Sequence, residues 1–222
     1  AVELYDIRND PHGTNNLADD PRFADKLREL STALTDWQVR QRDAGLVPEP
    51  MLIELDQQGV IRDYTTSDDY PVEDVVQLAQ AAGARDVGNL EMFIEQLQSG
   101  HPVKSYWAAN GLLLLGDEAK PALPVVEEVL GKVEPWTGIV LAELLIRLGD
   151  AKLATPYIEQ ALGSANLMVR LQAMETIVET DLLDPGLKPA IEAIVPDDPT
   201  DRPYDGRLAR YVLQLYETGV EQ

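Results

Sequence analysis

The sequence predicts a mainly α-helical fold in which helix pairs stack into an α-solenoid, and three observations support this. A short motif of apolar residues followed by Glu recurs four times at spacings of 32, 32 and 33 residues. The segments between its copies are rich in apolar residues at helical spacing. Gly116 and Gly149 end two of those segments, as glycine often does just beyond a helix. A repeat of this length with two helices per unit is typical of a solenoid. The four copies are Met92–Glu95, Pro124–Glu127, Pro156–Glu159 and Pro189–Glu192.

The chain opens on a segment that resembles a short strand. Leu4, Tyr5 and Ile7 favour an extended backbone, and the turn residues of Asn-Asp-Pro-His-Gly, residues 9–13, end it. No hairpin partner follows, so we expect an orphan strand over residues 3–7. Without its sheet, this segment should be either irregular or paired with another copy of the chain.

An amphipathic helix is predicted next, over about residues 21 to 42. Asp20 is a good N-cap and Pro21 suits the first helical position. Apolar residues recur every three or four positions and form one stripe, which must be buried against another surface. We expect the stripe to pack on the repeats or on a neighbouring molecule. Its members are Phe23, Leu27, Leu30, Leu34 and Trp37.

Residues 51–70 are mostly polar and are interpreted as a linker, which leaves residues 71–222 for the repeat domain. The segment Pro-Val-Glu-Asp-Val-Val, from Pro71, would begin the helix that caps the array, and the segment from Asp205 would form the helix that closes it. The block of residues 103–130, VKSYWAANGLLLLGDEAKPALPVVEEVL, resembles the HEAT family of helical repeats.

Charge and composition exclude several classes of function. Asp and Glu total 39 against 18 Lys and Arg, which gives a net charge of -21. Nucleic acid and anionic membranes would be repelled, so neither is an expected partner. The sequence contains no cysteine, which rules out disulfides, thiolate metal sites and cysteine nucleophiles. No run of apolar residues approaches the length of a membrane span.

The titratable residues form no catalytic or metal-binding pattern. His12 and His101 have no other histidine near them in sequence and are interpreted as surface residues. The Asp-Asp pairs at residues 19–20, 68–69 and 197–198 lack the spacing of a calcium loop and suit helix caps and turns. Trp107 and Trp136 lie at apolar positions of the second helices, which favours core packing over ligand stacking.

Basic residues on the second helices are the candidate ligand contacts, because these helices would line the concave side of a solenoid and make it less acidic than the whole chain. The other interpretation is that they are solvated charges and inter-repeat ion pairs that contribute little. The candidates are Lys104, Arg147, Arg170, Arg207 and Arg210.

Four segments of the first fifty residues occur in an order typical of one family: ELYDIRNDP from Glu3, NNLADDP from Asn15, LTDWQ from Leu34 and RDAGLVPE from Arg42. In these segments the chain resembles the C-terminal end of the type I sulfatase catalytic unit, most closely bacterial members near the heparan N-sulfatases. At Gly13 many relatives carry Glu instead. In the family, the first segment is a strand of a small sheet whose other strands come earlier in the chain. The resemblance therefore implies that this chain is the tail of a longer protein and that residues 1–50 complete its catalytic unit.

The resemblance also implies which functional residues the chain lacks. Sulfatases act through a formylglycine, made from the Cys or Ser of a C/S-x-P-x-R motif, and through a calcium ion held by Asp and Asn. No such motif occurs here. We therefore expect no catalytic residue and no cofactor in this chain. The formylglycine and the calcium ion would both lie in the missing N-terminal domain. Export to the periplasm is implied by the resemblance alone.

Three functions follow from these observations. In the first, the chain is a non-catalytic accessory or scaffold region of a sulfatase-like hydrolase. Its partner is its own catalytic domain, and a further protein or a second copy is a candidate for another. In the second, it is a free-standing HEAT-like adaptor that binds proteins. In the third, it is an enzyme of an unrecognised kind. The first is favoured because an adaptor has no use for an orphan strand and an undocked helix, and no nucleophile, base and orienting group come together in sequence for the third.

Overall fold

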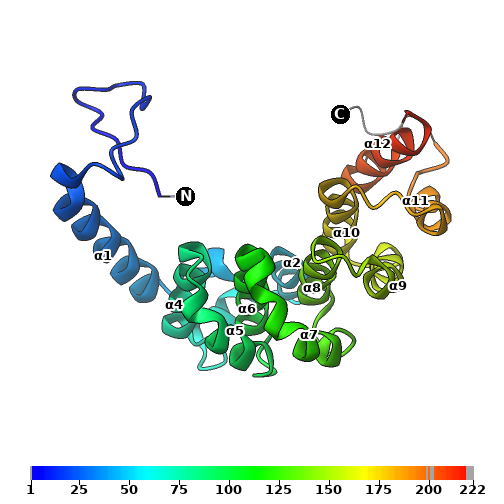
Figure 1. The fold of residues 1–222 in the computed structure, drawn as a ribbon, viewed down its shortest axis with the longest axis horizontal. Helices are drawn as coiled ribbons and strands as arrows, with labels where there is room; N and C mark the ends of the chain where they lie inside the picture. The colour runs from blue at the N-terminus through cyan, green and yellow to red at the C-terminus, as the bar shows by residue number, and fades with distance from the viewer. Residues whose placement is uncertain (1, 199, 201–202, 219–222) are drawn as a thin grey trace.

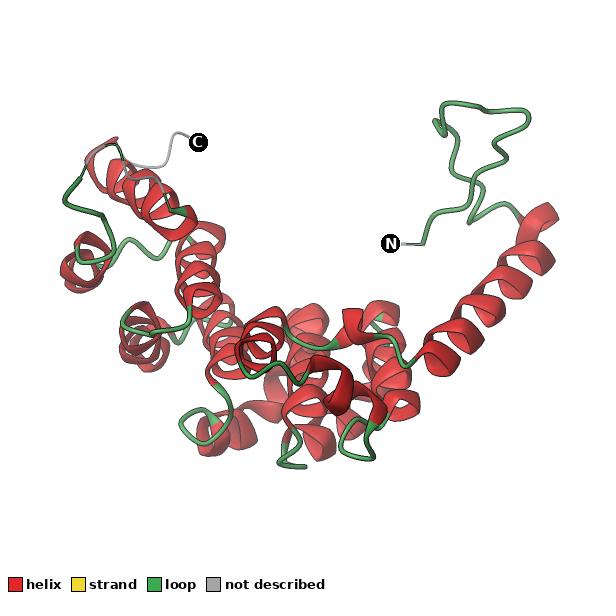
Figure 2. Cartoon of the chain, turned by 180° about the vertical axis from the view of Figure 1, so that it is seen from behind, coloured by secondary structure: helices red, strands yellow, loops and turns green. Residues whose placement is uncertain are grey.

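The computed structural model describes residues 2–198, 200 and 203–218. Within these residues every regular element is a helix, which confirms the mainly helical prediction, and Figure 2 shows helices and loops only. The helices form an arc, from which one long helix and the irregular N-terminal segment project (Figure 1). No helix in the described part of the chain is long and apolar enough to cross a membrane.

The N-terminal strand is not formed in this structure, and the segment is irregular, which is one of the two outcomes expected without its sheet. Residues 2–6 are irregular, since no described segment supplies a strand to pair with them. Instead, the backbone N–H of Leu4 donates to Asn16 Oδ1 over 2.9 Å, and the Leu4 carbonyl accepts the N–H of Leu17 over 2.8 Å. These bonds fold residues 2–20 into a loop at the tip of the projecting helix.

The projecting helix confirms the predicted amphipathic segment. A 3₁₀ turn, η1 (Pro21–Phe23), leads into α1 (Ala24–Gln41). The Asp20 side chain accepts the N–H of Arg22 over 2.9 Å, so Asp20 is the N-cap that the sequence indicates. We call residues 2–41 the arm, because α1 contacts the remaining helices only toward its C-terminal end (Figure 1).

Residues 51–70, expected as a linker, are largely helical. The segment after the arm contains η2 (Ala44–Leu46), α2 (Glu49–Gln57) and α3 (Ile61–Thr66). Val47, Pro50 and Met51 are buried. This segment is therefore part of the folded core.

The remaining helices form two rows. Consecutive members of the inner row contact one another, and helices of the outer row pack on them along the outside of the arc (Figure 1). The inner row consists of α4 (Val72–Ala84), α6 (Pro102–Leu115), α8 (Pro135–Arg147), α10 (Leu167–Thr180) and α12 (Tyr204–Thr218). The outer row consists of η3 (Val87–Asn89), α5 (Leu90–Leu97), η4 (Gly116–Ala122), α7 (Leu123–Val129), α9 (Ala151–Leu162), η5 (Pro185–Leu187) and α11 (Lys188–Glu192).

The motif that revealed the repeat marks the buried face of the outer helices, with one shift of register. Val126, Ile158 and Ile191 are fully buried, but in the first copy Phe93 is fully buried and Ile94 only partly. The Phe93 ring lies so close to Gly111 of α6 that a Cβ atom there would be 2.5 Å from it. An aromatic ring therefore fills the space that the aliphatic residues fill in later copies, one position earlier in the motif.

Candidate functional site

The five basic residues expected as ligand contacts lie on inner-row helices, but three of them are neutralised by carboxylates. Lys104 Nζ lies 3.5 Å from Asp74 Oδ2 of α4. Arg147 Nη2 lies 2.8 Å from Glu143 Oε1 of the same helix. The Arg207 guanidinium lies 4.3 Å from the ring centre of Tyr204, and Arg210 is partly buried. These contacts favour the interpretation of the basic residues as solvated charges and ion pairs over their interpretation as ligand contacts.

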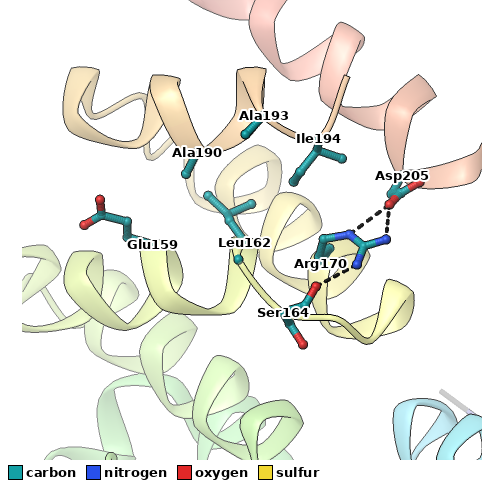
Figure 3. Close-up of a pocket in the computed structure, with 9 residues that line it drawn as sticks. Glu159, Leu162, Ser164, Arg170, Ala190, Ala193, Ile194 and Asp205 are labelled. Carbon is teal, nitrogen blue, oxygen red and sulfur yellow. Dashed lines mark hydrogen bonds and ion pairs between the residues drawn. The ribbon is translucent and has the colours of Figure 1, made fainter. Parts of the chain in front are cut away.

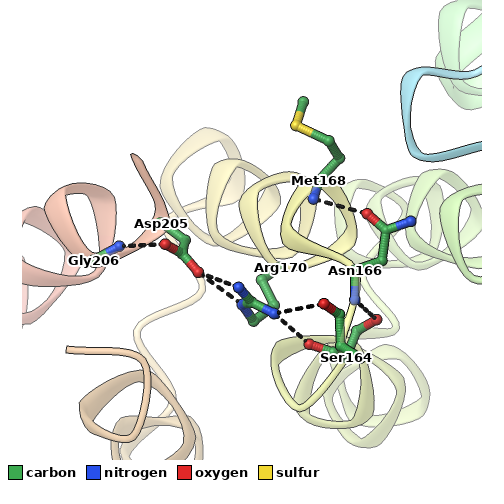
Figure 4. A network of polar contacts seen from close by, with 7 residues as sticks. Ser164, Asn166, Met168, Arg170, Asp205 and Gly206 are labelled. Atoms are coloured by element: carbon green, nitrogen blue, oxygen red, sulfur yellow. Dashed lines mark hydrogen bonds and ion pairs between the residues drawn. The ribbon is translucent and has the colours of Figure 1, made fainter. Parts of the chain in front are cut away.

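Arg170 has a structural partner that the sequence did not indicate. Its Nε donates to Asp205 Oδ2 over 2.8 Å, and its Nη2 donates to the same oxygen. Its Nη1 donates to the Ser164 carbonyl over 2.6 Å (Figure 4). Asp205 is buried, and its Oδ1 accepts the N–H of Gly206 over 2.9 Å. Arg170 thus ties the α9–α10 turn and α10 to the first turn of α12.

A cavity of about 540 Å³ adjoins this ion pair, between α9, α11 and the start of α12 (Figure 3). Its wall is apolar where Leu162, Ala190 and Ile194 face it. The charged groups of Arg170 and Asp205 are already paired with each other. Ser164 also lines the cavity, and its Oγ accepts the N–H of Asn166 over 3.1 Å.

The chain itself covers part of the inner face that carries the candidate ligand contacts. Trp107 of α6 donates from Nε1 to the Leu46 carbonyl over 2.8 Å. Asn166, the N-cap of α10, donates from Nδ2 to the Pro50 carbonyl over 2.9 Å and to Glu54 Oε1 over 3.0 Å. The segment from Leu46 to Glu54 therefore lies against the inner row (Figure 1). The apolar residues Val47, Pro50 and Met51 were the signal available in the sequence, but they span too few residues to define a period.

Beside α2 the inner face is acidic, contrary to the expected reduction of negative charge there. Glu49 and Glu175 line a small cavity of about 160 Å³ together with Tyr106. Partial burial raises the pKa of the Glu175 carboxyl, and the nearby carboxylates of Glu179 and Glu49 raise it further. This part of the surface would repel an anionic ligand.

His12 is exposed as expected, whereas His101 has a use that the sequence did not indicate; of the acidic pairs, Asp20 and Asp198 accept backbone hydrogen bonds as caps and turns do. His101 caps α6, because its Nδ1 accepts the N–H groups of Val103 and Lys104 over 3.2 and 3.3 Å. Its Nε2 lies 2.9 Å from the Asp69 carbonyl. Asp198 Oδ1 accepts the N–H of Thr200 over 2.8 Å. No group of three or more potential metal ligands occurs among the residues whose placement is described.

The apolar stripe of α1 is the clearest exposed feature of the molecule. Leu30, Leu34 and Trp37 are 48%, 56% and 47% exposed, so the stripe does not pack on the repeats as one of the two expectations had it. Phe23 and Leu30 also line an apolar cavity of about 380 Å³ between α1 and the N-terminal loop. An amphipathic helix that leaves its apolar face in water is typical of a docking surface.

Comparisons with known proteins find two short similarities, both to sulfatases. A stretch of 53 residues, 23% of this chain, is 54% identical to 11% of human N-sulphoglucosamine sulphohydrolase. A stretch of 41 residues, 18% of this chain, is 51% identical to 8% of the uncharacterized sulfatase YidJ of Escherichia coli strain K12. The similarity thus spans about a tenth of the length of these relatives. No model of a known protein family matches the chain, and no solved structure matches it. The chain therefore contains a sulfatase-related region.

Proposed function

We propose that this chain is the non-catalytic C-terminal accessory region of a sulfatase-like hydrolase. In this proposal a separate N-terminal catalytic domain of the same protein hydrolyses a sulfuric ester or an N-sulfate. The observation that carries the proposal is the similarity of 53 residues, at 54% identity, to a sulphohydrolase. The matched length agrees with the extent of the sulfatase-like segments, which lie between Glu3 and Glu49.

The arm is the part that would join the catalytic domain. Its residues 2–6 are irregular and its apolar stripe is exposed, as expected of elements separated from their partner surface. In the whole protein, residues 3–7 would add a strand to a sheet of that domain, and Leu30, Leu34 and Trp37 would pack on it. Formylglycine and calcium would belong to that domain alone.

The helix pairs would then form a HEAT-like α-solenoid that serves as a scaffold. Contacts between consecutive inner helices support this, since solenoid repeats interact chiefly with their neighbours. Such a scaffold would guide substrate access, bind a further protein or join two copies of the enzyme.

The activity of the purified chain provides the first test. We expect no release of sulfate from an aryl sulfate or from N-sulfoglucosamine by these 222 residues, because the formylglycine motif is absent. The full-length protein should hydrolyse at least one of the two. Turnover by the 222-residue chain would contradict the accessory role.

A charge in the stripe tests the docking. In the full-length protein, Leu34→Glu should lower the yield of active enzyme at least about tenfold, because burial of a leucine contributes about 1.5–3 kcal/mol and tenfold corresponds to about 1.4 kcal/mol. Thr32→Glu adds the same charge to the opposite, exposed face of α1 and should leave the yield unchanged. Equal yields from both variants would show that the stripe has no docking role.

A further inference from the structure

The turn at the end of α1 joins the arm to the array through an unusual set of contacts. We propose that Arg42 and Tyr70 form a clasp that fixes the direction of the arm, so that the array presents the apolar stripe of α1 in one orientation. The proposal concerns the 222-residue chain alone and does not depend on the hydrolase activity.

The first half of the clasp is the Arg42 side chain. Its Nε donates to the Thr65 carbonyl, and its Nη2 donates to the carbonyls of Ser67 and, over 2.7 Å, Tyr70. One guanidinium therefore satisfies three carbonyls, one in the last turn of α3 and two in the α3–α4 connection, using the fixed fork of donors that only arginine has. These charge-assisted bonds are among the stronger hydrogen bonds in proteins.

The backbone of Arg42 adopts the conformation that this contact requires. Arg42 ends α1 with φ 50° and ψ 59°, in the left-handed region that non-glycine residues seldom occupy. Its N–H donates to the Val39 carbonyl over 3.1 Å, and the N–H of Asp43 donates to the Gln38 carbonyl over 3.0 Å. The chain thus turns sharply at the residue whose side chain holds the array.

The second half of the clasp is Tyr70, which is fully buried. Its hydroxyl donates to the Asp43 carbonyl over 2.6 Å, so Tyr70 holds the residue after Arg42 while Arg42 holds the Tyr70 carbonyl. Burial raises the pKa of Tyr70 well above its ordinary value, with a further contribution from Asp43, and keeps this hydroxyl protonated as a donor.

Few other contacts could set the direction of the arm. None of the residues of α1 is buried, its most extensive contacts with the array are with α4, and Val39 near its end packs against the core. One turn and a half before its end, Thr35 Oγ1 accepts from Gln80 Nε2 over 2.6 Å. Because the stripe itself is exposed, the attachment rests on the polar contacts at residues 35, 42 and 70 and on the packing of Val39.

Spin-label distances test the clasp directly. The sequence contains no cysteine, so Glu29→Cys in α1 and Glu127→Cys in α7 give a unique pair of labels at exposed positions. Pulsed electron–electron double resonance on this double variant should give one narrow distribution of the distance between the two labels. Adding Arg42→Ala should at least double its width, whereas Arg40→Ala, which removes an exposed charge of the same helix end, should leave it unchanged.

Two further variants separate the clasp from folding. Arg42→Lys keeps the charge but not the fork of donors, and should broaden the distribution to an intermediate width. Tyr70→Phe keeps the buried ring and removes only the hydroxyl, and should also broaden it; this variant decides the outcome if circular dichroism shows that Arg42→Ala does not fold. Distributions as narrow as that of Arg40→Ala in the folded clasp variants would overturn the proposal and leave the proposed function unaffected.

Discussion

Replacement of Asp205 by alanine is expected to lower the free energy of unfolding by about 3–5 kcal/mol, the usual cost of removing one partner of a buried ion pair. Asp205 is 5% exposed and accepts two hydrogen bonds from Arg170, which would be left without its carboxylate. Urea unfolding followed by circular dichroism measures the loss.

An exposed ion pair is the matched control for this variant. Asp117 pairs with Lys120 on the surface, so Asp117→Ala should cost less than about 1 kcal/mol. The double variant Arg170→Met, Asp205→Leu should recover most of the stability lost in Asp205→Ala, because it leaves no unpaired charge. A loss below about 1 kcal/mol for Asp205→Ala would show that the pair does not hold α12 to α10.

Replacement of Trp107 by alanine is expected to lower the free energy of unfolding by about 3–5 kcal/mol, as large-to-small changes of packed aromatic residues do. Trp107 packs against the core, and its Nε1 holds the Leu46 carbonyl, so the variant should also release the segment around α2 from the inner face. Urea unfolding gives the energy, and hydrogen exchange of residues 46–54 reports the release.

Two control variants give the values with which the effect of Trp107→Ala is compared. Trp107→Phe keeps most of the packing and loses one hydrogen bond, so it should lower the free energy of unfolding by about 1 kcal/mol. Tyr211→Ala, at a residue that is 49% exposed on α12, should stay within about 0.5 kcal/mol of the parent. If Trp107→Ala resembled Tyr211→Ala, Trp107 would not anchor the α2 segment.

Local patterns made the helices, their caps and the repeat predictable. The stripe from Phe23 to Trp37 is sustained over several turns, and Asp20 and Pro21 stand where a helix start needs them. The recurrence of the outer-helix motif was visible because each unit buries an equivalent residue. In the first copy the fully buried position is Phe93 instead of Ile94. The space beside Gly111 of the neighbouring helix decides where the ring fits, and the local sequence does not show that space.

Contacts between distant segments were not predictable in the same way. Leu46 and Pro50 meet Trp107 and Asn166 across more than sixty residues of sequence, and nothing in their local pattern specifies those partners. The clasp was equally hidden, because an arginine at the end of a helix is usually a solvated charge. Charge pairing was also not predictable from local sequence alone, because the carboxylates that neutralise Lys104 and Arg147 are identified only by the packed helices.

The coding sequence that precedes the codon of Ala1 tests the accessory role most directly. We expect the same reading frame to encode a C/S-x-P-x-R motif upstream, followed by the alternating strands and helices of an α/β catalytic domain that continues into Glu3. Formylglycine in the corresponding peptide of the natural protein, detected by mass spectrometry, would show that this domain is active. A start codon at or shortly before Ala1, or an upstream domain without the motif, would contradict the assignment of this chain to a sulfatase-like hydrolase.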